Sequence, residues 1–207
     1  MKFVALLALA LTGCSSLGHT YVAPGYLSTS ADAVKRITVG AWAPADQAGA
    51  APVIARIAAD FVKLRKNYIV PESVALKGWE EGCKENREGV LAVRVLKTAV
   101  EKEEVELTVA VELFRCKDGA LLWRAEGKGD GKSNDENLKE MVSNYARDVD
   151  PAATQFAAPA FVVLQDVLNA LPDVVLSDAE VEEKIELGLV KPVYERVRIL
   201  SASLLVI

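Results

Sequence analysis

The sequence predicts an α+β fold, a mixed sheet of about five strands flanked by helices. From Val105 to Phe114, valine and leucine alternate with a second set of residues, a period of two that is typical of a half-buried strand. This second set is Glu106, Thr108, Ala110, Glu112 and Phe114. The neighbouring runs Val90–Val100 and Ala120–Lys128 complete an antiparallel three-strand meander. Apolar residues recur at helical spacing from about Ala51, and again over Thr154–Leu171, which predicts helices that cover the sheet.

A single domain is expected over residues 35–172, and it begins with a strand. Arg36–Trp42 places Ile37 and Val39 on one face. A helix follows from about Ala51, with Pro52 in its first turn, where a missing N–H costs little. Its apolar face comprises Val53, Ile54, Ile57, Ala58, Phe61 and Leu64, and its solvent face Arg56, Asp60, Lys63 and Lys66. Tyr68–Val70 is expected to form a second short strand, stopped by Pro71.

Turn residues separate the next elements. Gly78–Asn86 is expected to form a short helical turn that carries Trp79 and Cys83. The charged residues 101–104 form the tip that joins the first two strands of the meander. Lys117–Gly119 is a tight turn between the second and third strands, because glycine readily adopts positive φ.

Two helices and a bend follow the meander. Asn134 or Asp135 can cap a helix that runs through Arg147. Pro151 then permits a bend before the helix Thr154–Leu171, whose broad apolar stripe is expected to pack on the sheet.

Residues 173–207 are expected to lie beyond the domain, as an acidic helix and a tail. Ser177 with Glu180 is a capping-box pattern that opens a helix over 178–187, which Gly188 ends. Residues 189–207 mix apolar and basic side chains. They fit an edge strand, a partner-binding tail or a disordered end.

The first residues have the layout of a secretory signal peptide, predicted over residues 1–13. Lys2 gives a positive start and Phe3–Leu11 is an apolar run, too short for the roughly 20 apolar residues of a membrane-spanning helix. The chain is therefore expected to leave the cytoplasm. Residues 14–34 are rich in Ser, Gly, Pro and Thr without a period, which predicts a flexible tether.

Leu11-Thr12-Gly13-Cys14 resembles the lipobox of bacterial lipoproteins. The resemblance rests on Leu11, Gly13 and Cys14, and it implies that the mature protein begins at Cys14 and is held to a membrane by acyl chains such as palmitate. The alternatives are a chance cysteine after an ordinary signal peptide and a cytosolic chain with an apolar start.

The charge of the chain argues against two classes of partner. The net charge is -5, and removal of residues 1–13, whose only charged residue is Lys2, leaves -6. Nucleic-acid binding normally needs a basic stripe, and none is visible. Electrostatic binding to anionic lipid is disfavoured too, which leaves the acyl chains on Cys14 as the expected contact with the membrane.

Two cysteines remain if Cys14 carries lipid. In an exported protein, Cys83 and Cys116 are an even pair and are expected to form a disulfide. The alternative is two buried free thiols.

The sequence offers little for catalysis, and we expect no enzymatic activity, no cofactor and no metal. His19 is the only histidine and lies in the expected tether, so a Ser-His-Asp or Cys-His arrangement within the domain is excluded. A zinc site would lack ligands. Paired carboxylates occur as charge runs, 80–81, 103–104 and 182–183, which are usually solvated.

Gly131-Lys132-Ser133 matches the end of a phosphate-binding P-loop. The first glycine of that motif would fall on Glu126, whose carboxylate would repel phosphate. We therefore expect a flexible glycine-rich connection in which Ser133, Asn134 or Asp135 caps the next helix.

Aromatic residues are a further candidate for binding. Trp42, Trp79 and Trp123 could line a groove, or each could pack in the core or at an edge. Tyr21 and Tyr26 flank Pro24-Gly25 in the expected tether and could mark a docking segment. A plain linker is favoured.

The order of elements resembles the amino-terminal domain of TolB and related domains in envelope lipoproteins, including the curli-secretion lipoprotein. Residues 109–114, leading to 119–124, also resemble the strand, turn and strand of a myxobacterial and leptospiral lipoprotein group. This resemblance implies a non-enzymatic, periplasm-facing protein that docks other envelope proteins, with self-association possible. By analogy with enteric bacteria, Ser15 after the cysteine implies the outer membrane. A binding protein for a small ligand or cell-wall fragment, and an unrecognised enzyme, are the alternatives.

Overall fold

The computed structural model describes residues 15–30, 33–84, 86–102, 104–132, 135–146 and 151–188. Its strands are β1 (Ser15–Val22), β2 (Ile37–Trp42), β3 (Ser73–Ala75), β4 (Gly89–Glu101), β5 (Glu104–Arg115) and β6 (Leu121–Lys132). Its α-helices are α1 (Ala50–Arg65), α2 (Lys139–Ala146), α3 (Ala157–Asn169) and α4 (Asp178–Gly188), and its 3-10 helices are η1 (Ala45–Gln47), η2 (Trp79–Gly82) and η3 (Pro151–Phe156).

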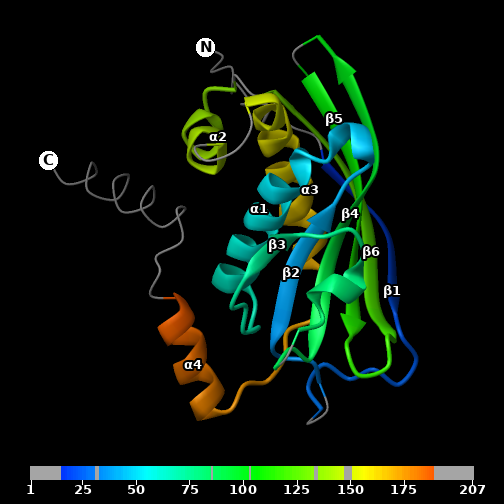
Figure 1. The fold of residues 1–207 in the computed structure, drawn as a ribbon, viewed down its shortest axis with the longest axis vertical. Helices are drawn as coiled ribbons and strands as arrows, with labels where there is room; N and C mark the ends of the chain where they lie inside the picture. The colour runs from blue at the N-terminus through cyan, green and yellow to red at the C-terminus, as the bar shows by residue number, and fades with distance from the viewer. Residues whose placement is uncertain are drawn as a thin grey trace, which may run out of the picture.

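The six strands form one mixed sheet in the order β1-β6-β5-β4-β2-β3 (Figure 1). The predicted meander is confirmed, since β5 pairs antiparallel with both β4 and β6, and Val111 lies opposite Val93 and Ala125. β2 runs parallel to β4 and to β3. Gly119 in the turn before β6 has φ +70°, the conformation for which glycine was expected there. The α+β fold with a mixed sheet is therefore confirmed, with six strands instead of about five.

The strand β1 corrects the expectation of a flexible tether over residues 14–34. Ser15–Val22 pairs antiparallel with β6, from Ser15 opposite Gly129 to Val22 opposite Trp123. Without β1, β6 would be the last strand of the sheet, and its free edge would present a row of unpaired backbone N–H and C=O groups. Long-range pairing thus orders a segment whose Ser, Gly and Thr content favours a tether.

The short strand expected at Tyr68–Val70 is displaced along the chain. Ile69 makes an isolated parallel bridge with Arg36, and regular pairing with β2 resumes only at β3, after Pro71. Proline has no N–H to donate to the ladder, so the strand is interrupted at this point.

The glycine-rich end of β6 is not the flexible connection that the sequence suggested. β6 continues to Lys132, and Gly127, Gly129 and Gly131 alternate along it on the face that meets α3. A Cβ at Gly129 would lie 2.9 Å from Cβ of Val163. These glycines therefore let α3 approach the backbone of the strand closely.

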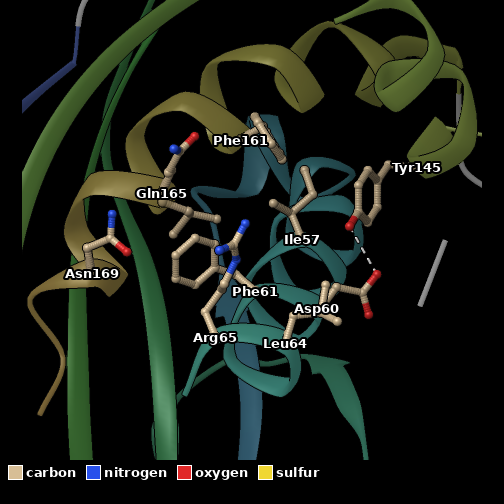
Figure 2. A pocket seen from close by; sticks show the side chains of 10 residues that line it. Ile57, Asp60, Phe61, Leu64, Arg65, Tyr145, Phe161, Gln165 and Asn169 are labelled. Atoms are coloured by element: carbon tan, nitrogen blue, oxygen red, sulfur yellow. Dashed lines mark hydrogen bonds between the residues drawn. The ribbon is translucent and has the colours of Figure 1, made fainter. Parts of the chain in front are cut away.

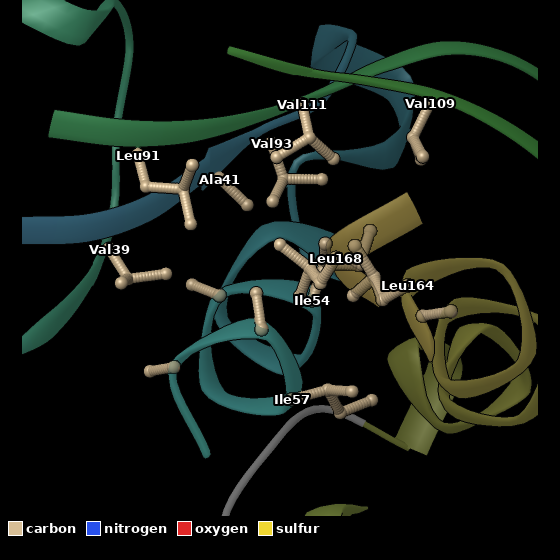
Figure 3. Close-up of a cluster of buried hydrophobic side chains, with 14 of the residues drawn as sticks. Val39, Ala41, Ile54, Ile57, Leu91, Val93, Val109, Val111, Leu164 and Leu168 are labelled. Carbon is tan, nitrogen blue, oxygen red and sulfur yellow. The ribbon is translucent and has the colours of Figure 1, made fainter. Parts of the chain in front are cut away.

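The helices α1 and α3 cover one face of the sheet, which we call the inner face (Figures 1 and 3). Ile54 of α1 and Leu164 and Leu168 of α3 are fully buried near the sheet residues Val93 and Val111. Burial of each such side chain contributes about 1.5–3 kcal/mol. The predicted apolar stripes of both helices are confirmed as core, except that Phe61 and Leu64 of α1 are only partly buried. The second stripe is divided between η3 and α3.

The helix α4 packs differently. None of its residues is buried. One bond of the predicted capping box is present, since the backbone N–H of Ser177 donates to Oε2 of Glu180 at 2.7 Å, and the Ser177 hydroxyl donates to the same oxygen at 3.0 Å. Ion pairs from Lys35 to Glu180 (2.9 Å) and from Arg36 to Glu183 (2.7 Å) attach the helix to the residues around the start of β2. Residues 189–207 and residues 1–13, the predicted signal peptide, lie outside the described residues.

Candidate functional site

The expected lipidation site, Cys14, lies outside the described residues, but its neighbour does not. Ser15 begins β1, and its hydroxyl donates a hydrogen bond to Oδ2 of Asp166 on α3. Any group attached to Cys14 would therefore leave the protein beside the β1 edge, next to α3.

The structure contains the disulfide expected between Cys83 and Cys116, with their Cα atoms 5.4 Å apart. It joins the segment after η2 to the residue that follows β5. Beside it, the ring of Trp79 stacks on Phe114 with centroids 4.9 Å apart. The disulfide and this stack hold the η2 segment against the face of the sheet opposite α1 and α3, which we call the outer face.

The three tryptophans do not line one groove. Trp42 and Trp79 pack against a small outer-face cluster of Leu76, Val90 and Ala92. Trp123 is fully buried in the core on the inner face. The tryptophans therefore pack in or against hydrophobic clusters, which was the alternative to a shared groove.

Charged side chains occupy the outer face beyond that cluster. Oε1 of Glu112 lies 3.3 Å from Nη2 of Arg94 and 3.1 Å from Nη1 of Arg124, and Glu112 is only 5% exposed. Lys128 pairs with Glu106 at 2.6 Å. None of the described helices α1 to α4 packs on this part of the sheet in Figure 1. It therefore offers a broad surface of paired charges.

A pocket of about 150 Å³ lies among α1, α2 and α3 (Figure 2). Its lining combines apolar and polar side chains: Ile57, Asp60, Phe61, Leu64, Arg65, Tyr145, Phe161, Leu164, Gln165 and Asn169.

Asp60 is the half-buried acid of this pocket. Burial raises the pKa of its carboxyl, whereas the hydrogen bond from Oη of Tyr145, at 3.0 Å, lowers it. The Arg56 guanidinium lies 5.7 Å from the centroid of the Tyr145 ring. The carboxyl and the phenol can bind a polar group, but the described residues that line the pocket include no histidine, cysteine or serine to act as a nucleophile or its base.

The helical period predicts that Asp60 and Lys66 lie on the solvent face of α1. Asp60 instead contacts α2, and Lys66 is only 8% exposed, with Nζ donating to the carbonyl oxygens of Leu171 (2.7 Å) and Asn169 (2.9 Å). The spacing of apolar residues predicts which face of α1 packs on the sheet. It does not predict the contacts that Asp60 and Lys66 make with residues of α2 and α3.

The other candidates from the sequence lie apart from this pocket. His19 is exposed in β1, and Gly131 and Lys132 lie within β6, so the P-loop match is part of an antiparallel strand. Tyr21 is in β1, and Tyr26 packs against the core. Within the described ranges, no three His, Cys, Asp or Glu side chains gather as a metal site.

Among the helices that the structure describes, none has both the length and the hydropathy needed to cross a bilayer.

No family model matches the chain, and no curated protein matches it. Among solved structures, the chain is similar to the PelC dodecamer from Paraburkholderia phytofirmans, with 18% identity, 78% of this chain and 98% of that chain covered, and a TM-score of 0.49. It is also similar to lipoprotein GNA1162 from Neisseria meningitidis, with 16% identity, 55% and 96% covered, and a TM-score of 0.33.

Proposed function

We propose that this chain is a bacterial lipoprotein, anchored by acyl chains on Cys14, whose periplasm-facing domain docks other envelope proteins and has no catalytic activity. The observation that carries the proposal is the sequence Leu11-Thr12-Gly13-Cys14, which follows an apolar run and directly precedes the folded strand β1. The lipid would thus be attached to the edge of the domain, without an intervening tether.

Two features support this compartment. The Cys83–Cys116 disulfide suits an oxidising environment such as the periplasm. Ser15, directly after the cysteine, suits the outer membrane by analogy with lipoprotein sorting in enteric bacteria.

The helical pocket is smaller than most ligand sites. Ligand sites usually enclose roughly 300–1,000 Å³, whereas this pocket has about 150 Å³. Hollows of about 730 Å³ lie elsewhere on the domain, one beside Arg115 and Asp118 and one beside Arg36 and Glu183. A binding protein for a small ligand or cell-wall fragment is the second candidate.

The outer face is the docking surface that we favour. Glu112 is held between Arg94 and Arg124, so these side chains are ordered before a partner arrives. Lys97 is exposed nearby and makes no ion pair among the described residues. A partner with an acidic group opposite Lys97 would gain a new ion pair without displacing the existing ones.

Photo-crosslinking in living cells tests this surface. A photo-reactive amino acid in place of Thr108, which lies opposite Lys97 and Lys128, would report contacts of the outer face. The same amino acid in place of Glu140, exposed on α2, is the matched control. We expect discrete crosslinked envelope proteins from position 108, reduced by the Lys97→Glu substitution, and none from position 140.

Equal crosslinking from both positions, or crosslinks insensitive to Lys97→Glu, would count against docking through this face. A purified protein that binds a cell-wall fragment, with binding lost in Phe161→Trp, would instead support the second candidate. The Trp side chain is expected to fill the pocket that Phe161 lines.

A further inference from the structure

The strand β1 forms an edge of the sheet with unusual composition. One side of β1 pairs with β6, and the other side has no strand partner among the described residues. Proteins usually protect such an edge with charged side chains or proline, because unpaired N–H and C=O groups invite aggregation. β1 contains no Asp, Glu, Lys, Arg or Pro.

Apolar side chains are exposed along the same edge and just after it. Leu17 is 45% exposed, Tyr21 40%, Val22 49% and Leu27 65%. An uncharged edge with this much exposed apolar surface is expected to be covered by something apolar or amphiphilic.

The position of the proposed lipid anchor restricts what can cover the exposed edge of β1. Ser15 is paired with Gly129, and its hydroxyl is bonded to Asp166, so the start of β1 is fixed to the body of the domain. Cys14 is one residue away, and neighbouring Cα atoms are about 3.8 Å apart. Acyl chains on Cys14 would therefore hold this edge directly at the bilayer.

An upright domain would place charges in the lipid. Ser15 lies opposite Gly129 of β6, and Gly129 lies opposite Leu107 of β5. The hairpin of β4 and β5 therefore extends past the level of Ser15 by the length from Leu107 to Glu104, which is about 10 Å for three residues of a strand. The tip of this hairpin carries Glu101, Lys102 and Glu104. With β1 perpendicular to the bilayer, these side chains would enter it, which is costly for charged groups.

We propose that the exposed edge of β1, together with Leu27, lies along the membrane surface and contacts lipid headgroups and the upper acyl region. This inference rests on the proposed lipidation of Cys14. The adjoining outer-face residues of β6, Arg124, Glu126, Lys128 and Asp130, have no net charge, so a zwitterionic lipid such as phosphatidylethanolamine suits this surface. The free backbone groups of β1 bond headgroups and water.

Fluorescence quenching by spin-labelled lipid tests this orientation in the full-length, membrane-extracted protein. Single cysteines are introduced as Val22→Cys on β1, Ser73→Cys on the opposite edge strand β3 and Lys102→Cys at the hairpin tip. Each is the one reactive thiol, because Cys14 would be acylated and Cys83 is bonded to Cys116. The labelled variants are reconstituted into phosphatidylethanolamine vesicles containing lipid with a nitroxide near the headgroup.

We expect strong loss of fluorescence at position 22 and little at positions 73 and 102. Equal quenching at 22 and 73, or quenching at 102 alone, would overturn the proposal. Pyrene at position 22 that forms excimers would show that a second copy covers the edge and would also overturn it. Flotation with the vesicles distinguishes failure of the proposed lipidation from failure of the proposed orientation. Protein that does not float contradicts the lipidation of Cys14. Protein that floats but shows no quenching at position 22 contradicts only the orientation.

Discussion

The hydroxyl of Ser15 donates a hydrogen bond to the carboxylate of Asp166, across a sequence separation of 151 residues. The bond links the first described residue of the chain to the helix α3. It is the side-chain contact that holds the start of β1, and with it the proposed anchor point, on the body of the domain.

Replacement of Asp166 with alanine is expected to loosen β1 without unfolding the domain. A hydrogen bond to a charged group contributes about 1.5–3 kcal/mol, and its loss should increase hydrogen exchange of the β1 amides while β4 and β5 remain protected. Gln165→Ala, an exposed pocket residue on the same helix, is the control and should leave β1 exchange unchanged. Unaltered exchange in both variants would mean that backbone pairing alone holds the strand.

Replacement of Gly129 with alanine is expected to destabilise the packing of α3 on β6. The new Cβ would lie 2.9 Å from Cβ and 3.0 Å from the backbone nitrogen of Val163, so the helix must shift. Overpacking of this kind costs about 1–3 kcal/mol in the free energy of unfolding, measurable by denaturant titration. Gly49→Ala, where a Cβ would meet nothing within 4 Å, should cost far less. Equal costs would show that α3 does not approach β6 as closely as described.

Reduction of the Cys83–Cys116 disulfide is expected to lower the stability of the domain. The cysteines are 33 residues apart, and closing a loop of this length contributes about 3–4 kcal/mol in the chain-entropy model. Urea unfolding with and without a reducing agent measures the difference. The Cys83→Ser, Cys116→Ser double variant should be insensitive to the reductant. Two alkylated thiols in the untreated protein would contradict the bridge.

The free energy of unfolding of the domain is expected to depend on pH through the titration of Asp60. Because burial raises the pKa of this carboxyl above its ordinary value of 3.8, the folded protein binds more protons than the unfolded chain just above that pH. Stability contributed by this group is therefore lost as pH rises from about the unfolded pKa through the folded one. Asp60→Asn should remove this loss. The difference in free energy of unfolding between the variant and the natural protein should therefore grow in favour of the variant between these two pKa values, and stay constant at higher pH. An unchanged pH profile would mean that Asp60 is solvated.

The sequence revealed the elements that depend on local pattern. The alternation from Val105 to Phe114 identified β5 because a period of two has one structural explanation, and the stripe on α1 identified its core face. β1 could not be found in this way, since its strand conformation comes from pairing with the distant β6. Likewise Gly127, Gly129 and Gly131 have the composition of a loop, and only the closeness of α3 explains them. The burial of Asp60 depends on α2, a contact that no helical period encodes.

The most direct test of the central claim is mass spectrometry of the amino-terminal peptide of the mature protein, purified from membranes. We predict a peptide that begins at Cys14 and carries acyl chains, and we predict that Cys14→Ser is unacylated and leaves the membrane fraction. An unmodified Cys14, a mature terminus at another residue, or a Cys14→Ser protein that stays in the membrane would contradict the account.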